Sequence, residues 1–216
     1  MHAVAFDMDG LMFDTERLYV KAFDYAGEKV GIGPAGYMVI RTLGMNDGMW
    51  KQCFREKFGE SYDEAGLLKY SDEFIADYYT GSHVPVKKGL FRLLEFLKEK
   101  KFRLAVASSS PYSTVVHHLE DAKILEYFDV IVTGDMVANS KPSPDIYVRA
   151  CELLKEAPRD CYALEDSPGG IRSAHDAGLK AILVPDLWQP TAEYAGVYYK
   201  KCNDLDEVRD FLETQI

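Results

Sequence analysis

Short apolar runs recur along the chain, and each ends in small, acidic or proline residues, a pattern typical of strands buried in a sheet. They cover residues 3–8, 103–109, 130–134, 161–166 and 180–185. Three other segments, at 114–125, 144–155 and 168–178, space apolar residues at intervals of three and four and predict amphipathic helices. Buried strands that alternate with such helices indicate an α/β fold with a doubly wound parallel sheet.

Residues 15–84 interrupt this alternation, because they show helical periodicity and no convincing strand. Two apolar helical faces stand out there, one made of Leu18, Ala22, Tyr25 and Ala26, the other of Leu67, Leu68, Phe74, Ile75 and Tyr78. So long a helical interval predicts an inserted cap of four-helix type at 15–84, with a catalytic core formed by 1–14 and 85–216. The core should hold five or six parallel strands, and the acidic segment 204–215 should close it with a helix.

Polar residues that could take part in catalysis or ligand binding lie where the predicted strands end. In an open parallel sheet, ligands bind beyond the carboxyl ends of the strands, so these residues should converge on one edge. The set contains four carboxylates, a run of serines and a lysine in the loop before the helix at 144–155. It consists of Asp7, Asp9, Ser108, Ser109, Ser110, Lys141, Glu165 and Asp166.

These residue types together predict a phosphoryl-transfer site. Carboxylates that lie close together in a partly buried site repel one another and need a cation. Only oxygen ligands are available, which favours Mg²⁺ over zinc. Lys141 and the backbone amides that follow Ser108 would attract a phosphate. One aspartate could then attack phosphorus while another transfers a proton.

Charge and composition narrow the possible partners. The formal net charge of −10 argues against nucleic acid and requires any phosphate site to be built locally. No apolar run approaches the roughly 20 residues that cross a bilayer, and no basic region followed by a long apolar stretch marks a signal sequence. The four cysteines are widely spaced and are expected to be reduced and mostly buried. We therefore expect a cytoplasmic protein without a membrane partner.

Four segments, in chain order, resemble the four motifs of the haloacid dehalogenase superfamily. Residues 3–16 (AVAFDMDGLMFDTE) resemble motif I, 106–110 (VASSS) motif II, 140–147 (SKPSPDIY) motif III and 164–178 (LEDSPGGIRSAHDAG) motif IV. The chain is similar to the β-phosphoglucomutase-like branch, in which a small helical cap is inserted right after motif I. The resemblance implies a Rossmann-like core of the superfamily's type, and together the motifs span nearly the whole chain.

The resemblance also implies a role for each residue that matches a motif. Asp7 would be the nucleophile that forms an aspartyl-phosphate. Asp9 would protonate the leaving group as a general acid and then activate water as a general base. Ser108, the backbone amide of Ser109 and Lys141 would bind the phosphoryl oxygens.

A metal site is implied by the same motifs. Asp7, the backbone carbonyl of Asp9, and Asp166 would hold Mg²⁺, with Glu165 near the metal or bound to it through water. Mg²⁺ is thus the expected cofactor.

Together these features predict a monomeric, Mg²⁺-dependent phosphatase that hydrolyses a small phosphorylated metabolite, namely a sugar, polyol or nucleoside phosphate, through a phospho-aspartate. A non-catalytic binding protein is disfavoured, because every catalytic position of the motifs is filled. Tyr19, Phe23, Met45 and Trp50 are candidate substrate contacts in the cap, although helical pattern alone does not select among them.

The main alternative is a β-phosphoglucomutase, which converts glucose 1-phosphate into glucose 6-phosphate with the same core residues. Mutases of this branch carry a cap histidine shortly after motif I and a cap arginine in a loop after a glycine. In this chain the corresponding positions hold Tyr19 and Asp47. An aspartate cannot bind the distal phosphate that a mutase must hold, so hydrolysis is favoured.

Overall fold

The computed structural model describes residues 3–43, 45, 47–79 and 83–216. Its centre is a six-stranded sheet in the order β3-β2-β1-β4-β5-β6, in which every neighbouring pair is parallel. The strands are β1 (Ala3–Phe6), β2 (Arg103–Ser108), β3 (Val130–Thr133), β4 (Cys161–Glu165), β5 (Lys180–Leu183) and β6 (Lys200–Lys201). The prediction of a doubly wound parallel sheet is confirmed.

Two helical layers cover the sheet, and the alternation of side chains along β1 shows why. Val4 and Phe6 point to one face, where they pack with α5 (Leu90–Glu99), α6 (Tyr112–Asp121) and α9 (Leu205–Glu213). Ala3 and Ala5 point to the other, towards α7 (Asp145–Leu154) and α8 (Pro168–Asp176). Alanines of β2, β4 and β5 share this second face, so α7 and α8 can approach the strands closely.

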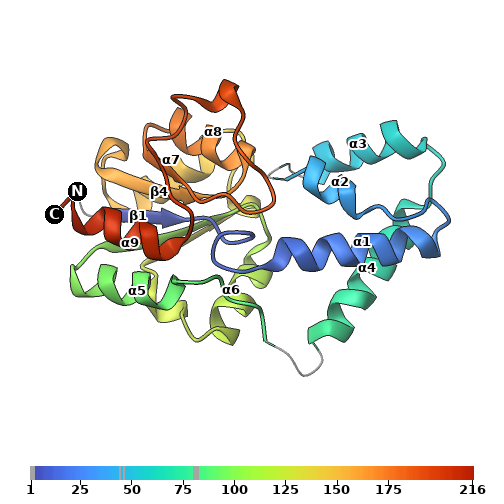
Figure 1. The fold of residues 1–216 in the computed structure, drawn as a ribbon, viewed down its shortest axis with the longest axis horizontal. Helices are drawn as coiled ribbons and strands as arrows, with labels where there is room; N and C mark the ends of the chain where they lie inside the picture. Colours follow the sequence, from blue (N-terminus) through green and yellow to red (C-terminus); the bar gives the residue numbers. More distant parts are fainter. Residues whose placement is uncertain (1–2, 44, 46, 80–82) are drawn as a thin grey trace.

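The helices α1 (Thr15–Lys29), α2 (Gly36–Arg41), α3 (Asp47–Phe58) and α4 (Glu64–Tyr79) form a separate group, here called the helical segment. It lies beyond the end of the sheet to which β1 points (Figure 1). Phe23, Met38, Phe54 and Leu67 are buried in a core of its own. Tyr25 and Tyr78, expected on buried helical faces, are instead each 40% exposed.

Two crossings join the helical segment to the sheet, and they run side by side. Phe13 bridges to Val86, and the backbone amide of Lys87 donates to Met12 at 2.9 Å. Asp186, in the loop after β5, forms ion pairs with both crossings. Its Oδ1 lies 2.6 Å from the Arg17 guanidinium and 2.8 Å from Nζ of Lys87. These contacts fix the start of α1 against the carboxyl edge of the sheet.

Helix boundaries differ from the expected ones where backbone conformation intervenes. The helix expected at 114–125 ends at Asp121, because Lys123 adopts a positive φ of 57° that an α-helix cannot continue. Short 3₁₀ turns complete the connections at Leu125–Tyr127, Gly134–Met136, Pro158–Asp160 and Ala192–Tyr194. In the described part of the chain, no helix is long and apolar enough to cross a membrane, and all four cysteines are unpaired.

Removing the cap of the closing helix should lower stability. The side chain of Asp204 accepts from the Glu207 amide at 2.9 Å, and Asp204→Ala should reduce the free energy of unfolding by about 1 kcal/mol. The Lys88 ammonium and the Glu207 amide lower the pKa of Asp204. This stabilisation should therefore be complete above the unfolded-state pKa of about 3.9 and be lost as pH falls through the folded-state value.

Urea unfolding of the wild type, Asp204→Ala and Asp204→Ser at several pH values measures this effect. Serine can still cap the helix, so Asp204→Ser should remain nearer to the wild type than the alanine variant at neutral pH. Equal stability of the alanine variant and the wild type at pH 7 would contradict the assignment.

Candidate active site

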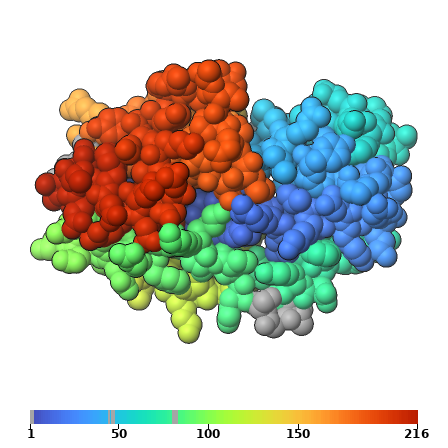
Figure 2. All heavy atoms as spheres, viewed as in Figure 1, coloured from blue at the N-terminus to red at the C-terminus, as the bar shows by residue number. Residues whose placement is uncertain are grey.

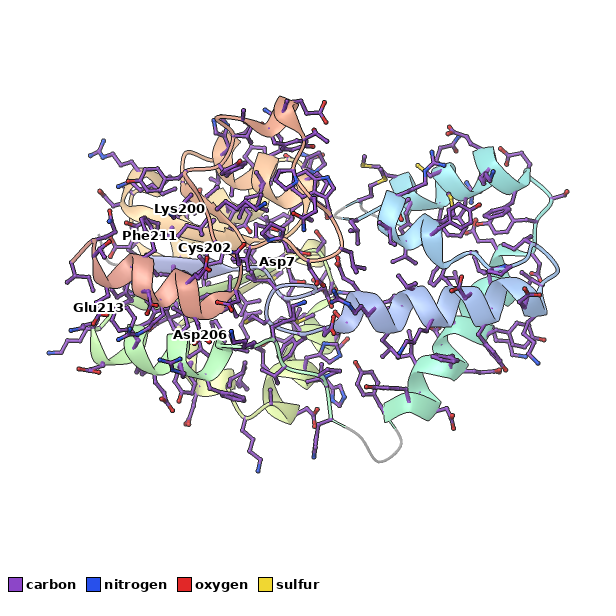
Figure 3. The ribbon with its side chains drawn as sticks, viewed as in Figure 1. Asp7, Lys200, Cys202, Asp206, Phe211 and Glu213 are labelled. Atoms are coloured by element: carbon purple, nitrogen blue, oxygen red, sulfur yellow. The ribbon has the colours of Figure 1, made fainter. Side chains whose placement is uncertain are left out.

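Asp7 directly follows β1 and continues its pairing with β4, because its backbone amide donates to the Leu164 carbonyl at 3.0 Å. Its side chain lies at the end of the strand that faces the helical segment (Figure 3). Lys141 reaches this carboxylate from the loop before α7, with its Nζ 2.5 Å from Oδ1 of Asp7. The same ammonium lies 2.6 Å from Oε1 of Glu165 and donates to the Ala107 carbonyl at 2.8 Å. Lys141 is only 2% exposed, and its three partners, at the ends of β1, β4 and β2, hold its ammonium group in place.

Glu165 is fully buried at the end of β4 and has several partners besides Lys141. The hydroxyl of Tyr147, from α7, donates to its Oε1 at 2.6 Å. Ser167 caps α8 by accepting from the Gly170 amide, and its hydroxyl lies 3.4 Å from Oε2 of Glu165. A Cβ at Gly170 would lie 2.0 Å from this carboxylate, so only glycine leaves room for it.

Asp166 differs from its neighbour, because neither of its carboxylate oxygens has a hydrogen-bond partner among the described residues. It is 1% exposed, and buried polar groups are otherwise nearly always paired. Asp7, Glu165 and Asp166 offer carboxylate oxygens that all lie within 4.8 Å of one another. A hard cation fits this donor set of oxygens and would satisfy the two unpaired atoms of Asp166.

The Asp9 carboxylate is oriented by one hydrogen bond on each oxygen. The hydroxyl of Thr15, at the start of α1, donates to Oδ1 at 2.7 Å, and that of Ser110 donates to Oδ2 at 2.8 Å. Its side chain does not join the group formed by Asp7, Glu165 and Asp166. The Asp9 side chain therefore lies apart from the carboxylate cluster of Asp7, Glu165 and Asp166.

The serines after β2 occupy two different environments. The Ser108 hydroxyl is buried and accepts from the Ser110 amide at 3.1 Å, which shapes the turn. The Ser109 hydroxyl is buried without a partner among the described residues, and Ser109 lines the cavity described below. Ser109 therefore has an unused donor at the edge of the sheet.

Glu16 adds a fifth carboxylate to the site, from the first turn of α1. It is buried, and one of its oxygens has no partner in the described part of the chain. Burial first, and then the charges of Asp9 and Asp7, raise the pKa of Glu16 to about 9. Gly10 makes this packing possible, since a Cβ there would lie 2.2 Å from Asp166 and 2.8 Å from Glu16.

The charges in the site do not balance. Of the cations in the described residues, Lys141 alone forms ion pairs with these carboxylates. Burial lowers the pKa of Lys141, but the charges of Asp7 and Glu165 outweigh that effect and raise it overall. Burial still raises the pKa of Asp7 and of Asp166, and neighbouring carboxylates add to the rise. The cluster therefore has more negative charge than one lysine can neutralise.

A cavity of about 780 Å³ opens between this edge of the sheet and the helical segment. Asp9 and Ser109 line the sheet side. All four candidate contacts in the cap line the other side, namely Tyr19, Phe23, Met45 and Trp50. The side chain of Asp47 lies outside the residues that the structure describes. In the space-filling view, a notch in the surface separates the orange part of the core from the blue and cyan helical segment (Figure 2).

Comparison with known proteins agrees with this geometry. The sequence profile of the haloacid dehalogenase-like hydrolases matches residues 4–184. This chain belongs to that family. Two relatives are the phosphorylated carbohydrates phosphatase of Thermotoga maritima, 32% identical over 84% of both chains, and protein CbbY of Rhodobacter capsulatus, 31% identical over 86% of both chains. The prediction of an enzyme of this superfamily is confirmed.

Solved structures of the family share the whole architecture. CbbY from Rhodobacter sphaeroides, in complex with xylulose-(1,5)bisphosphate, superposes with a TM-score of 0.77 at 28% identity over 96% of both chains. A β-phosphoglucomutase from Clostridium difficile gives a TM-score of 0.79 at 20% identity, with 100% of this chain and 96% of that one covered. At that level of identity, the second likeness shows the fold alone.

The structure brings the predicted site residues to one edge of the sheet and adds others that the sequence analysis did not single out. These are Thr15, which donates to Asp9, Tyr147, which donates to Glu165, and Glu16, which is buried beside the other carboxylates. Glu16 had a usable signal, because it is one more acid directly after the acidic turn of motif I. Tyr147 ends the segment that resembles motif III, but a tyrosine within a helical pattern is equally compatible with plain core packing, and so no role was expected for it.

Gly170→Ala should lower activity although alanine usually favours helices. The new methyl group would overlap the Glu165 carboxylate and displace it from Lys141. We expect a loss of at least about tenfold in kcat/KM, which is about 1.4 kcal/mol of transition-state stabilisation. Arg172→Ala, on an exposed position of the same helix, serves as the control. Unchanged activity in a folded Gly170→Ala protein would show that the position of Glu165 is unimportant.

Proposed function

We propose that this enzyme is a Mg²⁺-dependent phosphatase that hydrolyses small phosphomonoesters through a phospho-aspartate on Asp7. The observation that carries the proposal is Asp166, whose two buried oxygens lack hydrogen-bond partners among the described residues, beside the Asp7–Lys141 ion pair. In this proposal residues 15–84 act as the cap over a core of 1–14 and 85–216. The enzyme would work as a monomer in the cytoplasm.

In the first step, a carboxylate oxygen of Asp7 attacks phosphorus, and the bond from phosphorus to the leaving alcohol breaks. Asp9 donates a proton to the departing oxygen, which otherwise leaves as a poor alkoxide. Lys141, with Ser108 and the amide of Ser109, binds the phosphoryl oxygens and offsets their charge. The hydroxyls of Thr15 and Ser110, which donate to Asp9, hold its carboxyl group in one orientation throughout.

In the second step, Asp9 is ionised and takes a proton from water, and the resulting hydroxide attacks phosphorus. The bond to the Asp7 oxygen breaks, which releases inorganic phosphate and restores the carboxylate. Asp7, Asp166 and the backbone carbonyl of Asp9 would hold Mg²⁺, with Glu165 nearby. When bound, Mg²⁺ neutralises charge on the phosphoryl group and the acidic cluster.

The relatives support hydrolysis rather than isomerisation. The Thermotoga relative, 32% identical, is named for a phosphatase activity on phosphorylated carbohydrates. Tyr19 lines the cavity at the position where the resemblance places the mutase histidine. A mutase is therefore not favoured, and sugar, polyol or nucleoside monophosphates are the proposed substrates.

Replacing Asp7 with Asn should remove turnover while the fold persists, because an amide cannot attack phosphorus. We expect a loss of several orders of magnitude in kcat. Release of phosphate from p-nitrophenyl phosphate measures it, and circular dichroism checks the fold. Asp176→Asn, at the exposed end of α8, makes the same chemical change away from the site. Activity of Asp7→Asn within about tenfold of wild type would rule out Asp7 as the nucleophile.

Activity should require Mg²⁺, disappear with EDTA and return when Mg²⁺ is added. Ca²⁺ should compete with Mg²⁺ and inhibit, because it prefers six to eight oxygen ligands at longer distances. Binding can be followed separately from activity by the rise in melting temperature of the protein with Mg²⁺, which Asp166→Asn should reduce. Full hydrolysis in metal-free buffer would contradict the metal requirement.

A further inference from the structure

The cavity that Asp9 lines carries acidic groups on both of its walls. Asp9 and Glu16 lie on the side of the sheet and the crossing, and Asp72 lines it from α4 of the helical segment. Tyr19 lies between them. Burial, and then the charges of neighbours that include Asp9 and Asp72, raise the pKa of its hydroxyl. A ligand that extends into the cavity therefore meets the carboxyl groups of Asp9 on one side and Asp72 on the other.

No positive charge offsets these acids within the lining. Among the described residues that line the cavity, none is a lysine or an arginine. Lys141 is nearly fully buried and is already paired with Asp7 and Glu165. The residues omitted near the helical segment cannot supply a cation either, because by sequence they are Gly44, Asn46, Thr80, Gly81 and Ser82.

The wall on the side of the helical segment is rich in apolar side chains and rings, beside the hydroxyls of Thr42 and Ser71. Phe23 and Trp50 meet edge to face at 6.0 Å between ring centroids, and Phe23 meets Phe54 in the same way at 5.6 Å. Leu43 and Leu68 continue this surface. Such a wall gains free energy by covering an apolar or flat ring face, and its described residues include no basic side chain that would pair with an anion.

We propose that this cavity selects phosphomonoesters of uncharged alcohols that present a ring, such as nucleoside monophosphates, and that Asp72 excludes substrates with a second phosphate. The inference rests on the proposed function and narrows its substrate class. A second phosphate would have to lie between Asp9 and Asp72 with no lysine or arginine of the described lining to offset its charge, and like charges repel. The chain would thus differ from CbbY of Rhodobacter sphaeroides, which was solved with a bisphosphate.

A matched pair of substrates tests the exclusion. Adenosine 5′-monophosphate and adenosine 3′,5′-bisphosphate differ by one phosphate, and kcat/KM for release of the 5′-phosphate should be about 100-fold lower for the bisphosphate. p-Nitrophenyl phosphate is measured alongside with Mg²⁺. If p-nitrophenyl phosphate is not hydrolysed, the proposed function itself fails. If it is hydrolysed and the two adenosine phosphates react equally well, only the present inference is overturned.

Reversing the charge of Asp72 identifies the residue responsible. Asp72→Lys should raise the ratio of kcat/KM for the bisphosphate to kcat/KM for the monophosphate by at least about tenfold. Asp77→Lys is the control, because Asp77 is exposed on the same helix and does not line the cavity. An equal gain in both variants would reflect general charge alone and would overturn the role of Asp72.

The ring-binding wall is tested separately with Trp50→Leu, which keeps an apolar side chain. This variant should lower the ratio of kcat/KM for adenosine 5′-monophosphate to kcat/KM for glycerol 3-phosphate, which has no ring, by at least about fivefold. A parallel loss for both substrates would show that Trp50 supports the fold or the cap rather than the ring of the substrate, and would overturn this part of the proposal.

Discussion

The buried ion pair between Lys141 and Asp7 is the interaction on which the rest of the site depends. An ammonium this deeply buried is stable only with negative partners at contact distance, and Asp7 and Glu165 supply them at 2.5 and 2.6 Å. Those partners can meet only because β1 and β4 are adjacent and parallel, so that their carboxyl ends share one edge. The sheet order thus determines the electrostatics of the site.

Space around the acids is as important as their charge. Gly170 and Gly10 lie against the carboxylates of Glu165 and Asp166, where any side chain would overlap them. Tyr147 binds Glu165 from α7, the helix that approaches the sheet across small alanine side chains. The result is a cluster in which Glu165 is fully occupied by protein partners while Asp166 is not, and this difference separates a supporting carboxylate from one that needs a cation.

The helical segment determines what else the site can accept. It is joined to the core by paired crossings that Asp186 holds through Arg17 and Lys87, so the start of α1 and its Glu16 stay against the catalytic edge. Its far wall contributes rings and Asp72 rather than basic side chains. The core therefore carries the residues that match the family motifs, and in our proposal the helical segment sets the selectivity of this chain.

Alternating apolar runs and helical periodicities were enough to predict the parallel sheet, because buried strands and amphipathic helices have distinct repeats along a sequence. Residues at strand ends, such as Asp7 and Asp166, were predictable for the same reason, since parallel strands place their carboxyl ends on one edge. The residue pattern by itself could not separate Glu165 from Asp166, although the family resemblance favoured Asp166 as the metal ligand, because the distinction depends on Tyr147, which lies on another element. It could not place Asp72 in the cavity either, since only packing of the helical segment against the core decides which face of α4 a ligand meets.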